Sequence, residues 1–174
     1  MSTKITSGDH LPTITLERVG GGSITTGQPQ DGHDWQMVVV YRGRHCPLCT
    51  RQLKDLNAIK QSYYNIGVDI IAISGDSKEQ AESHFNYMEI DLPVAYGLTI
   101  EQMQQLGLYI SHPRSPEETD HPFAEPGLFL VNAEGKVQVV DISNNPFARP
   151  DLSKLPGGIK WMQENNYPIR GTYE

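Results

Sequence analysis

Residues 37–50 of this chain read Met37-Val38-Val39-Val40-Tyr41-Arg42-Gly43-Arg44-His45-Cys46-Pro47-Leu48-Cys49-Thr50. The apolar, β-branched run at 37–41 is typical of a central strand covered on both faces. Residues 47–64 carry apolar side chains at helical spacing, with Pro47 in the first turn, where its missing N–H is no loss. The sequence therefore predicts a strand that ends just before Cys46 and a helix that begins there.

Cys46 and Cys49 are the only cysteines among the 174 residues. Residues three apart on a helix share a face, so the second sulfur can reach the first. Unpaired N–H groups at a helix start stabilise an anion, and a cysteine there can have its pKa lowered from about 8.5 into roughly 3.5–7.5. We predict that Cys46, exposed and next to His45, is a nucleophile and that Cys49, more buried, resolves it.

Other interpretations of the two cysteines are weaker but remain open. They could be inert core residues, half of a zinc site, or a structural disulfide. Zinc needs four ligands, and no second Cys/His pair has suitable spacing, since His112 and His121 are isolated in a loop. A three-residue link closes too small a loop to stabilise the chain much. The nearby Arg42, Arg44 and Arg51 are either ordinary surface charges or a local field that favours the thiolate.

Composition limits the possible partners. Acidic residues outnumber basic ones, 21 against 14, with a pI near 5.3, so we expect neither nucleic acid nor an anionic membrane as a partner. No apolar stretch reaches membrane-spanning length, and residues 1–6 do not resemble a secretory signal. We expect one domain over residues 1–174, a cytoplasmic location, and no metal or organic cofactor.

The rest of the chain predicts an α/β fold: a mixed central sheet with helices on both faces and an extra N-terminal β-hairpin. A strand at 68–74 and a helix at 77–88, capped by Ser77, extend the pattern of residues 37–88 to β-α-β-α with a right-handed crossover. Asp76, Glu79 and Glu82 read as the solvated start of that helix. The remaining expected elements are a hairpin of 13–16 with 23–26, a strand at 92–96, a helix at 100–106, an exposed loop at 111–122, a hairpin of 128–131 with 137–140, and a last helix within 151–166.

Three segments in order resemble the alkyl hydroperoxide reductase/thiol-specific antioxidant (AhpC/TSA) group of peroxiredoxin-like proteins, which have a thioredoxin-like fold. Residues 7–16 are similar to its opening, and 127–137 to a strand and turn near its end. Residues 38–49 are similar to the "VVFYRGxWCPxC" segment of its Cys-x-x-Cys branch. The resemblance implies a redox-active Cys46/Cys49 pair.

The chain also departs from that group. Typical members resemble one another in Pro-x-x-x-Thr/Ser-x-x-Cys, whereas this chain has Val39 and Gly43 at those places and Pro126 where an arginine is usual. Arg44, His45 or Arg149 would then have to substitute. Pro126 resembles the cis-proline that faces the Cys-x-x-Cys of thioredoxins, an ordinary trans proline being the alternative. His45, where the branch has Trp, would add positive charge when protonated, an ordinary surface residue being the alternative.

The resemblance implies a thiol-dependent oxidoreductase with antioxidant activity, supported by Arg42, Arg44, His45, Pro47 and Pro126. Its substrate would be a peroxide or a disulfide, and its reductant a dithiol such as thioredoxin or the glutathione system. The alternatives are a thioredoxin-like protein disulfide reductase and a non-catalytic redox sensor or binding protein. Many members of the group that the chain resembles are dimers, so the resemblance also implies a homodimer.

Overall fold

The structure, a computed structural model, describes residues 4–174. Its centre is a five-stranded sheet with the order β5-β4-β3-β8-β9. Strands β3 (Trp35–Val40), β4 (Val68–Ile73) and β5 (Val94–Ala95) run parallel, and β8 (Gly127–Val131) and β9 (Val137–Ile142) add antiparallel pairs. The predicted mixed sheet is confirmed.

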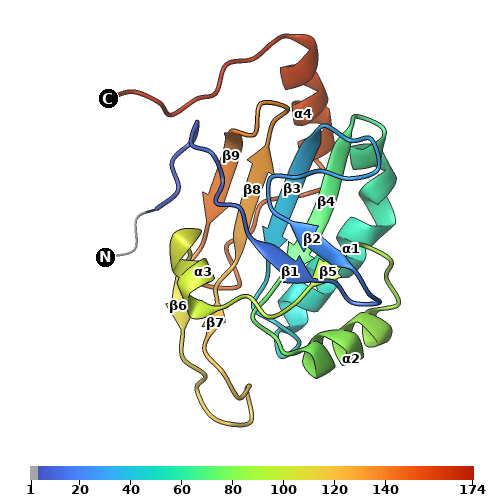
Figure 1. The fold of residues 1–174 in the computed structure, drawn as a ribbon, viewed down its shortest axis with the longest axis vertical. Helices are drawn as coiled ribbons and strands as arrows, with labels where there is room; N and C mark the ends of the chain where they lie inside the picture. Colours follow the sequence, from blue (N-terminus) through green and yellow to red (C-terminus); the bar gives the residue numbers. More distant parts are fainter. Residues whose placement is uncertain (1–3) are drawn as a thin grey trace.

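The helices lie on both faces of this sheet, as predicted (Figure 1). They are α1 (Pro47–Tyr64), α2 (Lys78–Met88), α3 (Ile100–Gln105) and α4 (Leu155–Glu164). Ser77 caps α2, and its side chain accepts the backbone N–H of Gln80. The last helix begins at Leu155, later than residue 151, with Pro156 in its first turn.

Side chains that alternate along β3 divide the core into two layers. Met37 and Val39 pack with the buried face of α1, whereas Val38 and Val40 pack against the opposite layer. That second layer contains α3 and the predicted N-terminal hairpin of β1 (Thr15–Glu17) and β2 (Ser23–Thr25). Because both faces are covered, β3 carries a continuous apolar run, and its carboxyl end is held rigidly where the Cys46 loop begins.

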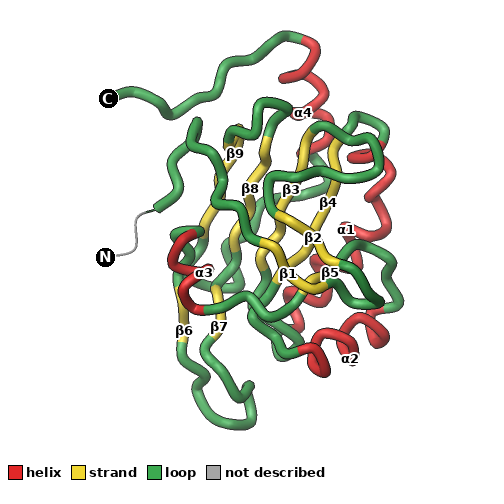
Figure 2. The backbone as a smooth tube through the Cα atoms, viewed as in Figure 1, coloured by secondary structure: helices red, strands yellow, loops and turns green. Residues whose placement is uncertain are grey.

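Residues 112–122 form a loop, as predicted for 111–122, and this loop connects the two strands of a ribbon that the sequence did not predict. Strand β6 (Ile110–Ser111) pairs antiparallel with β7 (Phe123–Ala124), and the ribbon and its connecting loop extend from the sheet near the end of β3 (Figure 2). Each strand has only two residues, too few to show a periodicity in the sequence. The ribbon brings its own side chains to the Cys46 loop.

Within residues 4–174, no helix combines the length and the hydropathy needed to cross a membrane.

Candidate active site

The loop between β3 and α1 presents both cysteines. The backbone N–H of Tyr41 continues the sheet by donating to Ile73, and Gly43 then turns the chain with φ of +139°. Cys46 is the N-cap of α1, and its sulfur accepts the backbone N–H of Cys49 at 3.4 Å. The nucleophile predicted from the sequence thus occupies a position where the helix start stabilises a negative charge.

Both sulfurs are buried and reduced. The exposed fraction is 2% for Cys46 and 0% for Cys49, so the expectation of an exposed Cys46 is wrong. The physical reason is that Cys46 packs in the core layer beneath α1. The Nη2 atom of Arg149 lies 3.0 Å from the Cys49 sulfur and 3.8 Å from the Cys46 sulfur. One guanidinium therefore bridges the pair.

The two thiols differ in acidity. A hydrogen bond from the Cys49 side chain, the Cys49 backbone N–H, and the hydrogen bond and charge of Arg42 lower the pKa of Cys46 to about 5, against the opposing effect of burial. Hydrogen bonding to Cys46 and burial raise the pKa of Cys49 well above its ordinary value, although Arg149 opposes this. Near neutral pH the site therefore holds a Cys46 thiolate next to a Cys49 thiol.

Of the three arginines grouped in the sequence, Arg42 is the one whose charge and hydrogen bonding lower the pKa of Cys46. Its Nε lies 3.0 Å from Oε2 of Glu125, and its guanidinium lies over the Phe123 ring, 4.7 Å from the centroid. Arg44 and Arg51 are exposed. The backbone N–H of Arg44 donates to Oδ2 of Asp76 at 2.7 Å, so Arg44 acts on the loop through its main chain.

His45 does not supply the positive charge that its position suggested. Burial and the charge of Arg42 lower its pKa to about 4, so the ring is neutral at neutral pH. The ring packs against Phe123, with centroids 4.5 Å apart.

The two prolines named from the sequence have different surroundings. Pro47 is in the first turn of α1, as predicted. The Glu125–Pro126 peptide bond is trans, because the described chain contains no cis peptide, and the resemblance to a cis-proline is wrong. The carbonyl of Pro126 accepts the Ser143 N–H, which fixes the chain between the β6–β7 ribbon and β8.

Two acidic residues of the site were not found from the sequence. Asp76, read as a solvated helix start, is 1% exposed and is held by the Arg44 N–H and by His121, whose Nε2 lies 3.3 Å from Oδ1. Glu125 is buried beside Arg42. Neither residue belongs to a local motif, since both contacts join segments distant in the sequence.

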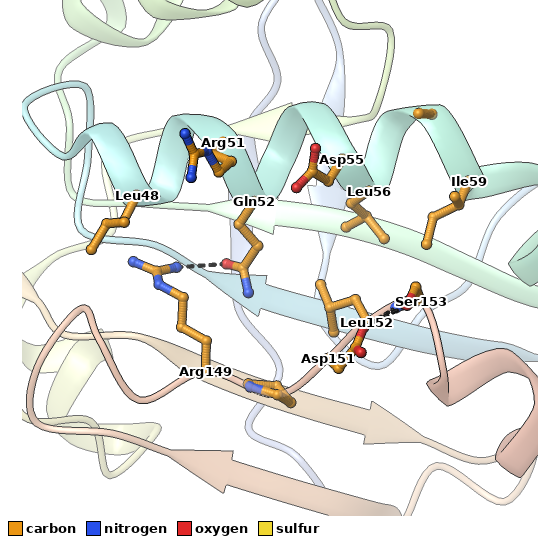
Figure 3. A pocket seen from close by; sticks show the side chains of 12 residues that line it. Leu48, Arg51, Gln52, Asp55, Leu56, Ile59, Arg149, Asp151, Leu152 and Ser153 are labelled. Atoms are coloured by element: carbon orange, nitrogen blue, oxygen red, sulfur yellow. Dashed lines mark hydrogen bonds between the residues drawn. The ribbon is translucent and has the colours of Figure 1, made fainter.

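A cavity of about 520 Å³ lies between α1 and the segment 149–153 (Figure 3). The Arg149 guanidinium lies at this cavity and donates to Oε1 of Gln52 at 2.8 Å. Apolar side chains form much of the wall: Leu48, Leu56, Ile59 and Leu152. Because Arg149 also contacts the sulfurs, it lies between this open volume and the buried cysteine pair.

No cluster of three or more His, Cys, Asp or Glu side chains within residues 4–174 is arranged to hold a metal ion.

Comparison with known proteins identifies the family. The model of the AhpC/TSA family matches residues 7–140. The chain belongs to the AhpC/TSA family. This agrees with the resemblance of the Cys46 segment, and it makes the changes at Gly43 and Pro126 departures within the AhpC/TSA family.

Related proteins support this assignment. A probable 1-Cys peroxiredoxin from Syntrichia ruralis is 21% identical over 137 residues, which are 76% of this AhpC/TSA chain and 62% of that relative. This chain thus spans less than two thirds of the relative's length. The peroxiredoxin-like protein from Aquifex aeolicus superposes with a TM-score of 0.74 at 19% identity, covering 92% of this chain and 89% of that one. AhpC from Mycobacterium bovis gives 0.72 at 14% identity, covering 99% of each chain. The structural neighbours confirm the peroxiredoxin-like, thioredoxin-type fold.

Proposed function

We propose that this protein is a thiol-dependent peroxidase in which Cys46 attacks the peroxide and Cys49 resolves the product. The observation that carries the proposal is the asymmetry of the pair: a Cys46 sulfur whose pKa is lowered to about 5 next to a Cys49 thiol that stays protonated. A thiolate is the form that attacks a peroxide, and a neighbouring thiol is the form that condenses with a sulfenic acid.

The reaction has two steps. The Cys46 thiolate attacks one peroxide oxygen, the O–O bond breaks, and the leaving hydroxide or alkoxide takes up a proton, which leaves Cys46 as a sulfenic acid. Cys49 then attacks the Cys46 sulfur, water leaves, and a disulfide forms. An external dithiol reduces this disulfide and is itself oxidised. Arg42 and Arg149, the two cations on the sulfurs, stabilise the charge on the attacking sulfur and on the leaving oxygen.

Burial favours a peroxide over a protein disulfide as the substrate. With 2% of Cys46 exposed, a molecule as small as hydrogen peroxide needs little movement to reach the sulfur. A protein disulfide has to displace the covering segments first. The supporting roles of Arg44, His45, Pro47 and Pro126, the cytoplasmic location and the homodimer stay predictions.

Turnover tests the proposal. Reduced wild type, Cys46→Ser and Cys49→Ser are each given hydrogen peroxide or an insoluble protein disulfide substrate, with excess thioredoxin or glutathione. We expect many turnovers with peroxide for the wild type and none for Cys46→Ser. For Cys49→Ser we expect a sulfenic acid that accumulates when the reductant is left out and that forms a mixed disulfide with the external thiol when it is present. A single stoichiometric oxidation of the wild type would indicate a redox sensor. Faster turnover with the protein disulfide would indicate a disulfide reductase.

A further inference from the structure

We propose that Glu125 is a positioning residue of this site and that its carboxylate holds the Arg42 guanidinium against the Cys46 sulfur. The inference deepens the proposed function, because it assigns the origin of the reactivity of Cys46. It concerns a contact between a buried carboxylate and a partly buried guanidinium that stand 83 positions apart in the sequence.

The carboxylate of Glu125 has a partner on each oxygen. Oε1 accepts the Ser111 hydroxyl at 2.9 Å, and Oε2 lies 3.0 Å from Nε of Arg42. The side chains of Glu125 and Arg42 are 4% and 15% exposed. A buried carboxylate that lost its cation would be strongly unfavourable, so the two groups hold each other in place.

The main chain around Glu125 is fixed on both sides. Its N–H donates to the Tyr109 carbonyl at 2.8 Å, and the next carbonyl, that of Pro126, accepts the Ser143 N–H at 3.0 Å. The carboxylate therefore has little freedom to follow a moving arginine. Any adjustment has to come from Arg42.

Arg42 has several rotatable bonds, and an unrestrained arginine loses about 2 kcal/mol of rotamer entropy when it is ordered. Its fork of N–H donors can serve two partners at once. Here Nε lies 3.0 Å from Oε2 of Glu125 as an ion pair, without the alignment of a hydrogen bond, and the guanidinium carbon lies over the Phe123 ring. From this position Arg42 lowers the pKa of Cys46 through its charge and hydrogen bonding. Glu125 and Phe123 thus restrict the guanidinium to an orientation in which it also contacts the sulfur.

The positioning role and a plain charge effect predict opposite changes. If Glu125 acted only as a negative charge near the thiolate, its removal would lower the pKa of Cys46. If Glu125 orients Arg42, its removal frees the guanidinium, weakens its contact with the sulfur, and raises that pKa. The direction of the change therefore distinguishes the two roles.

The experiment measures the ultraviolet absorbance of the Cys46 thiolate as a function of pH in a Cys49→Ser background, where only one thiol titrates. We expect Glu125→Ala to raise the midpoint by about one pH unit or more, and Glu125→Gln, which keeps an acceptor for Arg42, to move it by less than about half a unit. Arg42→Ala should raise the midpoint as well. Adding Glu125→Ala to Arg42→Ala should then cause no further rise.

Asp69→Asn is the matched control. Asp69 is also a buried carboxylate, but it accepts the Gln30 N–H at the other end of β4. The Asp69→Asn variant should change the free energy of unfolding and leave the midpoint of the Cys46 titration unchanged. If Glu125→Ala does not fold, Ser111→Ala, which frees one carboxylate oxygen, should give a smaller rise in the same direction.

An unchanged or lowered midpoint in folded Glu125→Ala, or in Ser111→Ala where the former does not fold, would overturn the inference. The measurement needs no peroxide and no reductant. A protein without peroxidase turnover but with the expected midpoint changes would refute the proposed function and leave the role of Glu125 standing.

Discussion

Oδ1 of Asp76 lies 2.5 Å from the place where a Cβ atom on Gly43 would stand. At the position of Gly43, typical peroxiredoxins have Thr or Ser. The buried Asp76 carboxylate thus fills space next to the backbone of residue 43 and also accepts the N–H of residue 44. A side chain at position 43 and the buried carboxylate at position 76 would need the same space, so the structure has room for only one of them.

Restoring the family's hydroxyl residue should therefore damage this protein. Gly43→Thr adds side-chain atoms that collide with Asp76, and it also places a β-branched residue at φ +139°. We expect it to lower the free energy of unfolding by about 2 kcal/mol or more, measured by chemical denaturation, without raising peroxidase activity. Gly43→Ala combined with Asp76→Ala should show a favourable coupling relative to the sum of the single changes. A stable and more active Gly43→Thr would contradict this explanation.

The rate of reaction with peroxide should depend on pH through Cys46. Since its pKa is about 5, the thiol form dominates below that pH, and the rate should rise as the pH increases through 5. Above about pH 6 the rate should be flat, because nearly all of the sulfur is already thiolate. His45, with a pKa of about 4, adds no second transition there. Brief pH-jump kinetics with hydrogen peroxide would measure the rate as a function of pH. A rate that reaches half of its maximum near pH 8.5 would disprove a lowered pKa of Cys46.

Replacement of Arg149 should affect the resolving step more than the first attack. Its Nη2 is closer to the Cys49 sulfur than to the Cys46 sulfur, and the cation that lowers the pKa of Cys46 is Arg42. We expect Arg149→Ala to slow disulfide formation about tenfold, as for the loss of a charge-assisted hydrogen bond. A dimedone-type trap of sulfenic acid should label this variant more than the wild type. Labelling of Arg149→Lys should lie between that of Arg149→Ala and that of the wild type. Equal labelling of all three proteins would contradict a role of Arg149 in the resolving step.

The cavity beside Arg149 should matter for bulky peroxides. Ala58 is exposed on α1 and lines the cavity, so Ala58→Trp places a ring in the open volume without entering the core. We expect kcat/KM for an aryl hydroperoxide to fall about tenfold while that for hydrogen peroxide stays within about twofold. Lys54→Trp, exposed on the same helix outside the cavity lining, is the control. Equal losses with both peroxides would show that the cavity has no part in substrate binding.

The sequence predicted the elements that have enough residues to show a period. Helix α1 begins and ends at the predicted residues, 47 and 64, because a proline marks its start and apolar side chains repeat along it. The β6–β7 ribbon has no such signal. Asp76 was misread because an acid before a helix is usually solvated, and its burial arises from contacts with loop 43–44 and His121. Arg149 was one of three possible substitutes for a missing arginine, and only its tertiary contacts distinguish it.

Two residues of the site come late in the chain, which has a consequence during its synthesis. Glu125 lies 79 positions after Cys46 in the chain, and Arg149 lies 103 positions after it. Until those segments emerge and dock, Arg42 lacks its ion pair with Glu125, and the two sulfurs lack their contacts with Arg149. A nascent chain at the ribosome should therefore carry a Cys46 thiol without its lowered pKa, and fast reaction with peroxide should begin only when these segments have docked.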